Sequence, residues 1–183
     1  QNCSSLKTIS LPDELPLVRD MGYCFQNCRS LTSISLPDEL PNVTSISYCF
    51  QNCTSLTYLE IPSLPALTNV TGSYSGACGQ LGYAISNITC PVVFKGLAKV
   101  TSMNYSFQNC SSLTSISLLE LPNVNDIELC FKNCTSLKSI SLPELSNVSS
   151  MGSCFELCSS LTSISLPELP NVTSMAGCLC GCT

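Results

Sequence analysis

Hydrophobic residues recur along the chain in a short pattern that alternates with serine and threonine. In residues 31–36, Leu31, Ile34 and Leu36 are separated by polar residues. A period of two predicts a strand that points Ile34 and Leu36 inward and the serines beside them outward. Pro37 cannot extend backbone pairing, so the strand is expected to end there. Equivalent triplets are Leu6/Ile9/Leu11, Leu56/Leu59/Ile61, Leu113/Ile116/Leu118, Leu137/Ile140/Leu142 and Leu161/Ile164/Leu166.

A second hydrophobic pattern follows each predicted strand. Leu40, Val43, Ile46, Phe50 and Cys53 are three or four residues apart, which predicts a 3₁₀ or short helical return segment with its apolar side inward. The Phe residues of successive segments are expected to stack as a spine. The same places are held by Val18/Met21/Phe25, Val100/Met103/Phe107, Val124/Ile127/Phe131 and Val148/Met151/Phe155.

The two patterns together form a repeat. From Cys3 to Cys182, the last cysteines of the CFxxC-like segments follow one another at steps of 25, 25, 25, 32, 24, 24 and 24 residues. A fixed period in this range is typical of a solenoid, in which each coil buries its apolar side against its neighbours. We therefore expect one α/β solenoid over residues 1–183, with about seven coils of 24–25 residues.

The repeat is irregular over residues 62–109. Tyr74 and Ser75 replace the Cys-Phe pair, and the next unit carries extra residues within GYAISNITCPVVFKGLAKV. LGYAISNI and ITCPVVF are both candidates for the strand of this unit. The insertion is either a tolerated loop or a functional protrusion, since insertions in solenoids lie on one face that often binds.

The consensus CxSLTSISLPxLxNVTSMxxCFxNC resembles the leucine-rich repeats of the BspA-like class, also called the Treponema type. The resemblance covers nearly the whole chain apart from residues 62–100. It implies a right-handed coil with short parallel strands on one face and 3₁₀, short helical or irregular segments on the other. It also implies an extracellular or cell-surface location and an adhesive or surface-coat role, with no catalytic residues.

Composition narrows the range of functions. Only 10% of the residues are charged and the net charge is −5, which gives no basic patch for nucleic acid. No apolar run is long enough to predict a membrane span. The chain has no histidine, so Ser-His-Asp and Cys-His catalysis are excluded, and we expect no enzyme activity, cofactor or metal site. Acidic residues recur at one turn and are expected to line an edge: Glu14, Glu39, Glu120, Glu144 and Glu168.

The fifteen cysteines allow two interpretations. In the first, disulfides join each coil to the next between cysteines 20 or 21 residues apart; in the second, the cysteines are buried thiols that pack as small hydrophobes. The predicted pairs are Cys3–Cys24, Cys28–Cys49, Cys110–Cys130, Cys134–Cys154 and Cys158–Cys178. The cysteines outside this scheme are Cys53, Cys78, Cys90, Cys180 and Cys182, with Cys78–Cys90 a candidate further bridge. Without histidine, the Cys178/Cys180/Cys182 cluster favours disulfide or thiol roles over zinc.

Ten of the thirteen asparagines lie in N-x-S/T sequences, which predicts N-glycosylation of a eukaryotic surface protein. Two template positions, the LPNVT turn and the QNCT segment, generate most of these sites, and both are expected to face solvent. The predicted sites are Asn2, Asn42, Asn52, Asn69, Asn87, Asn104, Asn109, Asn133, Asn147 and Asn171.

Three functions remain after these exclusions. The first is a structural repeat that stacks end to end into a fibre or coat, because the chain starts and finishes at the same phase of the repeat without atypical capping units. The second is a segment of a longer adhesin that binds host matrix or other cells. The third is an ice- or glycan-binding array built from the hydroxyl face of the strands. That face includes Thr32, Ser33, Ser35, Thr114, Ser115, Ser117, Thr162, Ser163 and Ser165.

Overall fold

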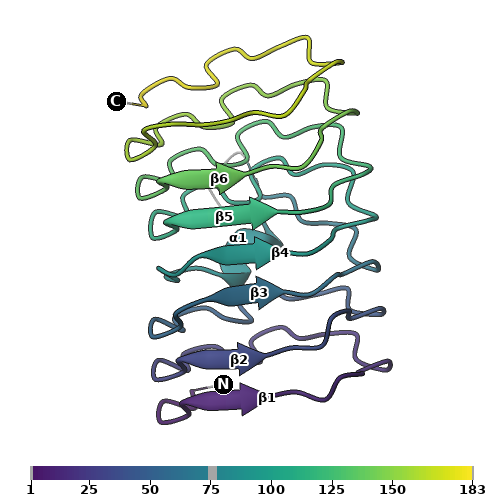
Figure 1. Ribbon diagram of the computed structural model, residues 1–183, viewed down its shortest axis with the longest axis vertical. Helices are drawn as coiled ribbons and strands as arrows, with labels where there is room; N and C mark the ends of the chain where they lie inside the picture. Colours follow the sequence, from purple (N-terminus) through teal and green to yellow (C-terminus); the bar gives the residue numbers. More distant parts are fainter. Residues whose placement is uncertain (1, 74–77, 183) are drawn as a thin grey trace.

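The computed structural model describes residues 2–73 and 78–182. Short parallel strands lie above one another on one side of a coil that rises from the N-terminus to the C-terminus (Figure 1). The strands are β1 (Thr8–Ser10), β2 (Ser33–Ser35), β3 (Leu59–Ile61), β4 (Val92–Phe94), β5 (Ser115–Leu118) and β6 (Ser139–Ser141). β1 pairs with β2, and β3 to β6 form a second sheet in chain order. The predicted leucine-rich repeat solenoid is confirmed.

The strands pair in the register of the repeat. Ile9 lies opposite Ile34, and Ile116 lies opposite Ile140, so equivalent residues stack on one another. Ser33 and Ser35 are exposed while Ile34 points toward the core, as the period of two predicts. The prediction of a strand at Leu161/Ile164/Leu166 is wrong, because residues 159–169 contain no strand. Ile164 is half-buried there, as Ile140 is in β6, but no described strand forms beside β6 on that side.

The return segments consist of successive tight turns rather than regular helices. The N–H of Cys28 donates to the carbonyl of Phe25 at 3.1 Å, and that of Leu31 donates to Cys28 at 3.0 Å. Such bonds between residues three apart are typical of 3₁₀ geometry. Each turn also bonds to the next coil, for example from the N–H of Phe25 to the carbonyl of Cys49 at 2.9 Å.

The predicted phenylalanine spine is present on both sides of the irregular region. The rings of Phe25 and Phe50 stack with their centroids 5.4 Å apart. Phe131 stacks on Phe107 at 5.2 Å and on Phe155 at 5.6 Å. These side chains are almost completely buried and form one core with the leucines, isoleucines and valines of both segments.

The irregular coil contains the one described helix, α1 (Gln80–Ala84), and takes its strand from the ITCPVVF candidate, which becomes β4. The N–H of Phe50 donates to Ala84 at 2.8 Å and that of Asn52 donates to Ser86 at 3.0 Å. Ile85 therefore interrupts the spine.

The same register changes the alignment of the repeat. The side chain of Asn87 stacks on that of Asn52, so the next residue, Ile88, takes the place of the repeat cysteine. The assignment of Cys78 to that place is therefore wrong: Cys78 lies before α1. The predicted changes at Tyr74 and Ser75 lie outside the described residues.

No helix in the described ranges is long and apolar enough to cross a membrane.

Candidate interaction surface

A groove runs along the strand edge of the first coils, where the chain turns after each strand. Leu15, Leu36 and Pro37 form its apolar floor, and Asp13, Glu14, Asp38 and Glu39 line its rim. The cavity here measures about 460 Å³. A second cavity of about 210 Å³ shares Leu36 and Pro37 with the first and continues toward Tyr58. The two together offer an open, acidic trough rather than an enclosed active site.

A small ionic cluster lies at the strand end of this groove. The Lys95 ammonium is 2.7 Å from a carboxylate oxygen of Asp38 and 2.8 Å from one of Glu60. The Tyr58 hydroxyl donates to the other Glu60 oxygen at 2.9 Å. The hydrogen bond from Lys95 holds the pKa of both carboxyls below their usual values, and it raises the pKa of Lys95. The cluster therefore stays ionised at neutral pH and fixes the position of the half-exposed Tyr58 ring.

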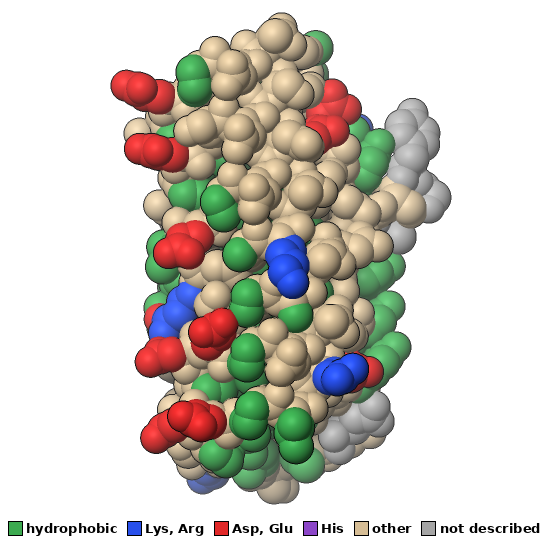
Figure 2. Space-filling view, turned by 90° about the vertical axis from the view of Figure 1, so that its right-hand side faces the viewer, with side chains coloured by type: hydrophobic (Ala, Val, Ile, Leu, Met, Phe, Trp, Pro, Cys, Tyr) green, Lys and Arg blue, Asp and Glu red, His purple; other side chains and the backbone are tan. Residues whose placement is uncertain are grey.

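Acidic side chains form a column along one edge of the molecule (Figure 2). This arrangement agrees with the predicted line of carboxylates at the recurring turn. Another cavity, of about 480 Å³, lies at the same turn between Leu119, Glu120, Pro122 and Glu144. Leu119 is 50% exposed there. In the described residues, no group of three or more Cys, Asp or Glu side chains is arranged to hold a metal ion.

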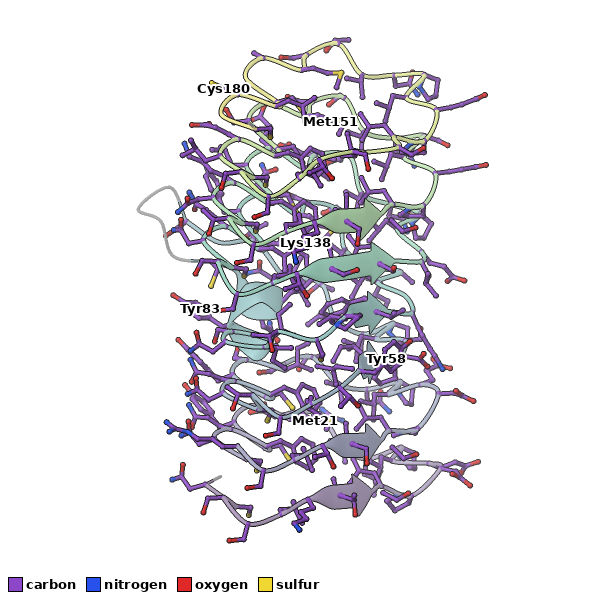
Figure 3. All side chains as sticks on the ribbon, turned by 60° about the vertical axis from the view of Figure 1, so that its left-hand side comes forward. Met21, Tyr58, Tyr83, Lys138, Met151 and Cys180 are labelled. Atoms are coloured by element: carbon purple, nitrogen blue, oxygen red, sulfur yellow. The ribbon has the colours of Figure 1, made fainter. Side chains whose placement is uncertain are left out.

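The hydroxyl face of the strands is discontinuous. Ser33 stacks in register over Thr8, and the Ser139 hydroxyl donates to that of Ser115 at 3.0 Å. Between these groups, β3 and β4 present Glu60 and Val93 instead of serine. Tyr58 and Lys138 both lie on the strand side, whereas Tyr83 of α1 lies on the opposite side (Figure 3). The array of hydroxyls is thus divided into two short patches.

Most cysteines of the repeat lie in the core as thiols. The thiol of Cys53 donates to the carbonyl of Phe25, and that of Cys134 donates to Phe107, both at 3.1 Å. Cys158 and Cys182 make the same bond to the phenylalanine of the preceding coil. Burial raises the pKa of Cys53 to about 12 and that of Cys158 to about 11. A buried thiol of this kind is unreactive.

The predicted disulfide pairs are not present in this arrangement. Free thiols are found at Cys28, Cys49, Cys110, Cys130, Cys134, Cys154, Cys158 and Cys178, whereas Cys3 and Cys24 are exposed at the first coils. Cys90 is also a buried thiol, so the candidate bridge from Cys78 to Cys90 is not formed. The alternative of a buried thiol ladder describes this state. The diagonal pairing stays an untested prediction, and its Cys110–Cys130 pair excludes any other partner for Cys110.

Most of the predicted glycosylation sites are also hydrogen-bonding positions of the fold. In the QNCT segment, the amide of Asn27 donates to Asn2 at 2.8 Å, that of Asn52 to Asn27 at 2.7 Å and that of Asn87 to Asn52 at 2.7 Å. Asn133 donates to Asn109 in the same way. These asparagines adopt φ values near +60°, a conformation that asparagine tolerates better than most residues.

Asparagines of the turn position bond to the backbone of the preceding coil. Asn42 donates to the carbonyl of Pro16 at 2.8 Å, Asn147 to Pro122 at 2.9 Å and Asn171 to Ser146 at 2.7 Å. Asn104 donates to the carboxylate of Asp126 at 2.7 Å. Asn69 differs, because its carbonyl oxygen accepts bonds from the N–H and hydroxyl of Thr71. Hydrogen bonding of these asparagines between coils was not predicted from the sequence. A signal was present, because Asn27 and Asn123 hold the same template positions without forming an N-x-S/T sequence.

Comparison with known proteins decides the family. The signature of the BspA type leucine-rich repeat region, in six copies, matches residues 1–91 and 84–182. The chain belongs to the BspA-type leucine-rich repeat family. No curated protein matches the sequence. The fold is similar to that of a leucine-rich repeat protein from Eubacterium ventriosum, with a TM-score of 0.57 and 19% identity. The similarity covers 96% of this chain and 42% of that one, so this chain spans less than half the length of the solved protein.

Proposed function

We propose that this BspA-type chain is a non-enzymatic, extracellular structural repeat that associates end to end into a surface fibre or coat. The family is one of surface and adhesion repeat proteins, which supports the coarser part of this assignment. The finer part is argued from the backbone donors at the outer edge of the last described coil, which a second copy or further residues of the same chain would pair.

The edge consists of backbone donors that the two preceding coils use. The N–H groups of Ser153, Phe155 and Leu157 donate to Ala176, Cys178 and Cys180 of the next coil at 2.7–2.9 Å. The equivalent N–H groups of Gly177, Leu179 and Gly181 make no such backbone bond within the described ranges. Leu179 and Met175 are 45% and 42% exposed beside them. Unpaired edges of this kind template the addition of another coil.

The first coil offers the complementary surface. Leu6, Ile9 and Leu11 are only partly buried there, and β1 pairs on one side alone. A contact between the last coil of one copy and the first coil of the next is heterologous, and such contacts propagate into filaments when they do not close a ring. A continuation of the same solenoid in a longer chain would satisfy the same groups, which is the adhesin alternative.

Charged substitutions at the open edge test this proposal. We expect the parent chain to form filaments at high concentration by electron microscopy, and the double variant Met175→Lys/Leu179→Lys to remain monomeric in sedimentation. Leu119→Lys is the matched control, because Leu119 is similarly exposed but lies away from both ends. Loss of assembly in the control, or a parent chain that stays monomeric at every concentration, contradicts end-to-end stacking.

The second candidate, an adhesin segment, is favoured by the acidic groove beside Tyr58. An exposed aromatic ring next to fixed charges is a common anchor for a protein partner. Saturable binding of the monomer to an immobilised matrix protein, lost in Tyr58→Ala, would favour this function over the fibre. The third candidate, an ice- or glycan-binding array, is weakened by the division of the hydroxyl face at β3 and β4.

We also propose that the native protein carries N-linked glycans, with Asn69 as the first site. Asn69 is exposed, and within the described residues its amide nitrogen donates no hydrogen bond to a neighbouring coil, so a sugar there leaves the ladders intact. We expect the intact mass of native material to exceed the 19.5 kDa polypeptide, with the Asn69 peptide modified more fully than the Asn133 peptide. A native mass equal to that of the polypeptide contradicts this proposal, as does equal occupancy of the two peptides.

A further inference from the structure

Cys78 stands apart from the other cysteines because it belongs to neither repeat position. It lies just before α1, in the irregular coil. Its side chain is half-buried and lies beside that of Cys110 in the next coil. The repeat thiols of Cys53 and Cys134 bond instead to backbone carbonyls.

The contact between the two cysteines depends on Gly82. A Cβ atom placed on Gly82 would lie 2.8 Å from the Cβ of Cys78 and 3.0 Å from the sulfur of Cys110. Both side chains therefore converge on the space that the missing side chain leaves. The carbonyl of Ser106 lies 2.7 Å from the same point, so no larger residue fits without moving the backbone.

The Cys78 side chain is partly exposed, whereas Cys110 is buried behind it. A small cavity of about 50 Å³ lies between the coils and is lined by Cys78, Cys110, Asn87 and Asn109. The hydrogen bond to Cys110 lowers the pKa of Cys78, whereas the same bond and burial raise the pKa of Cys110. Thiol–disulfide exchange begins with attack by the thiol that ionises more readily and is accessible.

We propose that Cys78 and Cys110 form an oxidation site that closes into a disulfide between neighbouring coils when the protein meets a small-molecule disulfide. The Cys78 thiolate attacks one sulfur of the small disulfide, forms a mixed disulfide and releases one thiolate. The Cys110 thiol then gives its proton to solvent and attacks the Cys78 sulfur, which releases the second thiolate. The protein loses two electrons and two protons, and the small disulfide is reduced to two thiols.

The Cys78–Cys110 disulfide restrains the irregular coil and adds no cross-link between the regular coils. It ties the segment before α1 to the coil that begins at Ser106, in addition to the existing bond from the N–H of Gly82 to Ser106 at 3.0 Å. Amide exchange in α1 (Gln80–Ala84) is therefore expected to slow by roughly tenfold on oxidation, as the local opening of a cross-linked segment becomes rarer.

Titration of the dilute chain with oxidised glutathione, followed by alkylation and non-reduced peptide mapping, tests the proposal. We expect Cys78 and Cys110 to become protected from alkylation together, in a peptide that has lost two hydrogen atoms in mass, roughly tenfold faster than Cys134. Cys78→Ser should leave Cys110 reduced under the same conditions. Cys180→Ser, which removes an exposed cysteine far from the pair, should leave the bridge unchanged.

Three outcomes would overturn the assignment. One is a bridge from Cys78 to Cys90 or from Cys110 to Cys130 in the parent chain. Another is a mixed disulfide at Cys78 that never resolves onto Cys110. The third is oxidation of Cys134 before the pair. All three are read on the unsubstituted chain, so the test does not depend on the folding of a variant.

Discussion

Asparagine at the left-handed position of each coil satisfies two demands with one side chain. It tolerates φ near +60°, and its amide group donates to the asparagine below and accepts from the asparagine above. From the sequence alone these residues were interpreted as glycosylation motifs, because an N-x-S/T sequence does not reveal the conformation of the turn that contains it. The informative signal was the presence of Asn27 and Asn123 at the same positions outside any N-x-S/T sequence.

Leu157 breaks this rule and provides a test of it. It holds the asparagine position at φ 61° and is 43% exposed, so it bears the strain of the left-handed conformation without the ladder bond. We expect Leu157→Asn to raise the free energy of unfolding by about 1 kcal/mol, through relief of strain and a new bond to Asn133. Leu157→Ala is the control, because alanine keeps the strain. Equal urea midpoints for the two variants would show that the position does not favour asparagine.

At the scale of elements, the regular coils could be predicted and the irregular coil could not. The spacing of Leu31, Ile34 and Phe50 determines which side chains face inward, and the regular coils repeat this spacing. The strands and the phenylalanine spine could therefore be predicted from the pattern. In residues 62–109 two segments matched the strand pattern equally well. The choice of β4 depends on pairing with β3 on one side and β5 on the other, which is tertiary information.

The candidate surface shows the same limit. The line of acidic turns followed from the period alone, since equivalent positions of a solenoid stack on one edge. The cluster of Lys95 with Asp38 and Glu60 could not be foreseen. Lys95 and Asp38 are 57 residues apart in the sequence. They meet only because the irregular coil places its extra residues outside the repeat, which brings Lys95 over Asp38. The Cys78–Cys110 contact was hidden for the same reason.

The whole molecule behaves as a stack in which each coil contacts only its neighbours. Stability in such a stack is a sum over interfaces, so a coil with one neighbour opens more readily than a coil with two. Strands are present in the described ranges from Thr8 to Ser141, and the coil beyond them is held by turn bonds and partial burial.

Hydrogen exchange of single amides tests this view of the whole molecule. In the monomer we expect the N–H of Leu179 to exchange freely, whereas the N–H of Phe131, which donates to Cys154 at 2.9 Å, is protected. In assembled material the Leu179 amide should gain at least roughly tenfold protection, because the next copy supplies its acceptor. Phe131 should not change, since its acceptor lies in its own chain. Protection of Leu179 in the monomer would mean that residues of the same chain already cover the edge, and end-to-end growth would lose its physical basis.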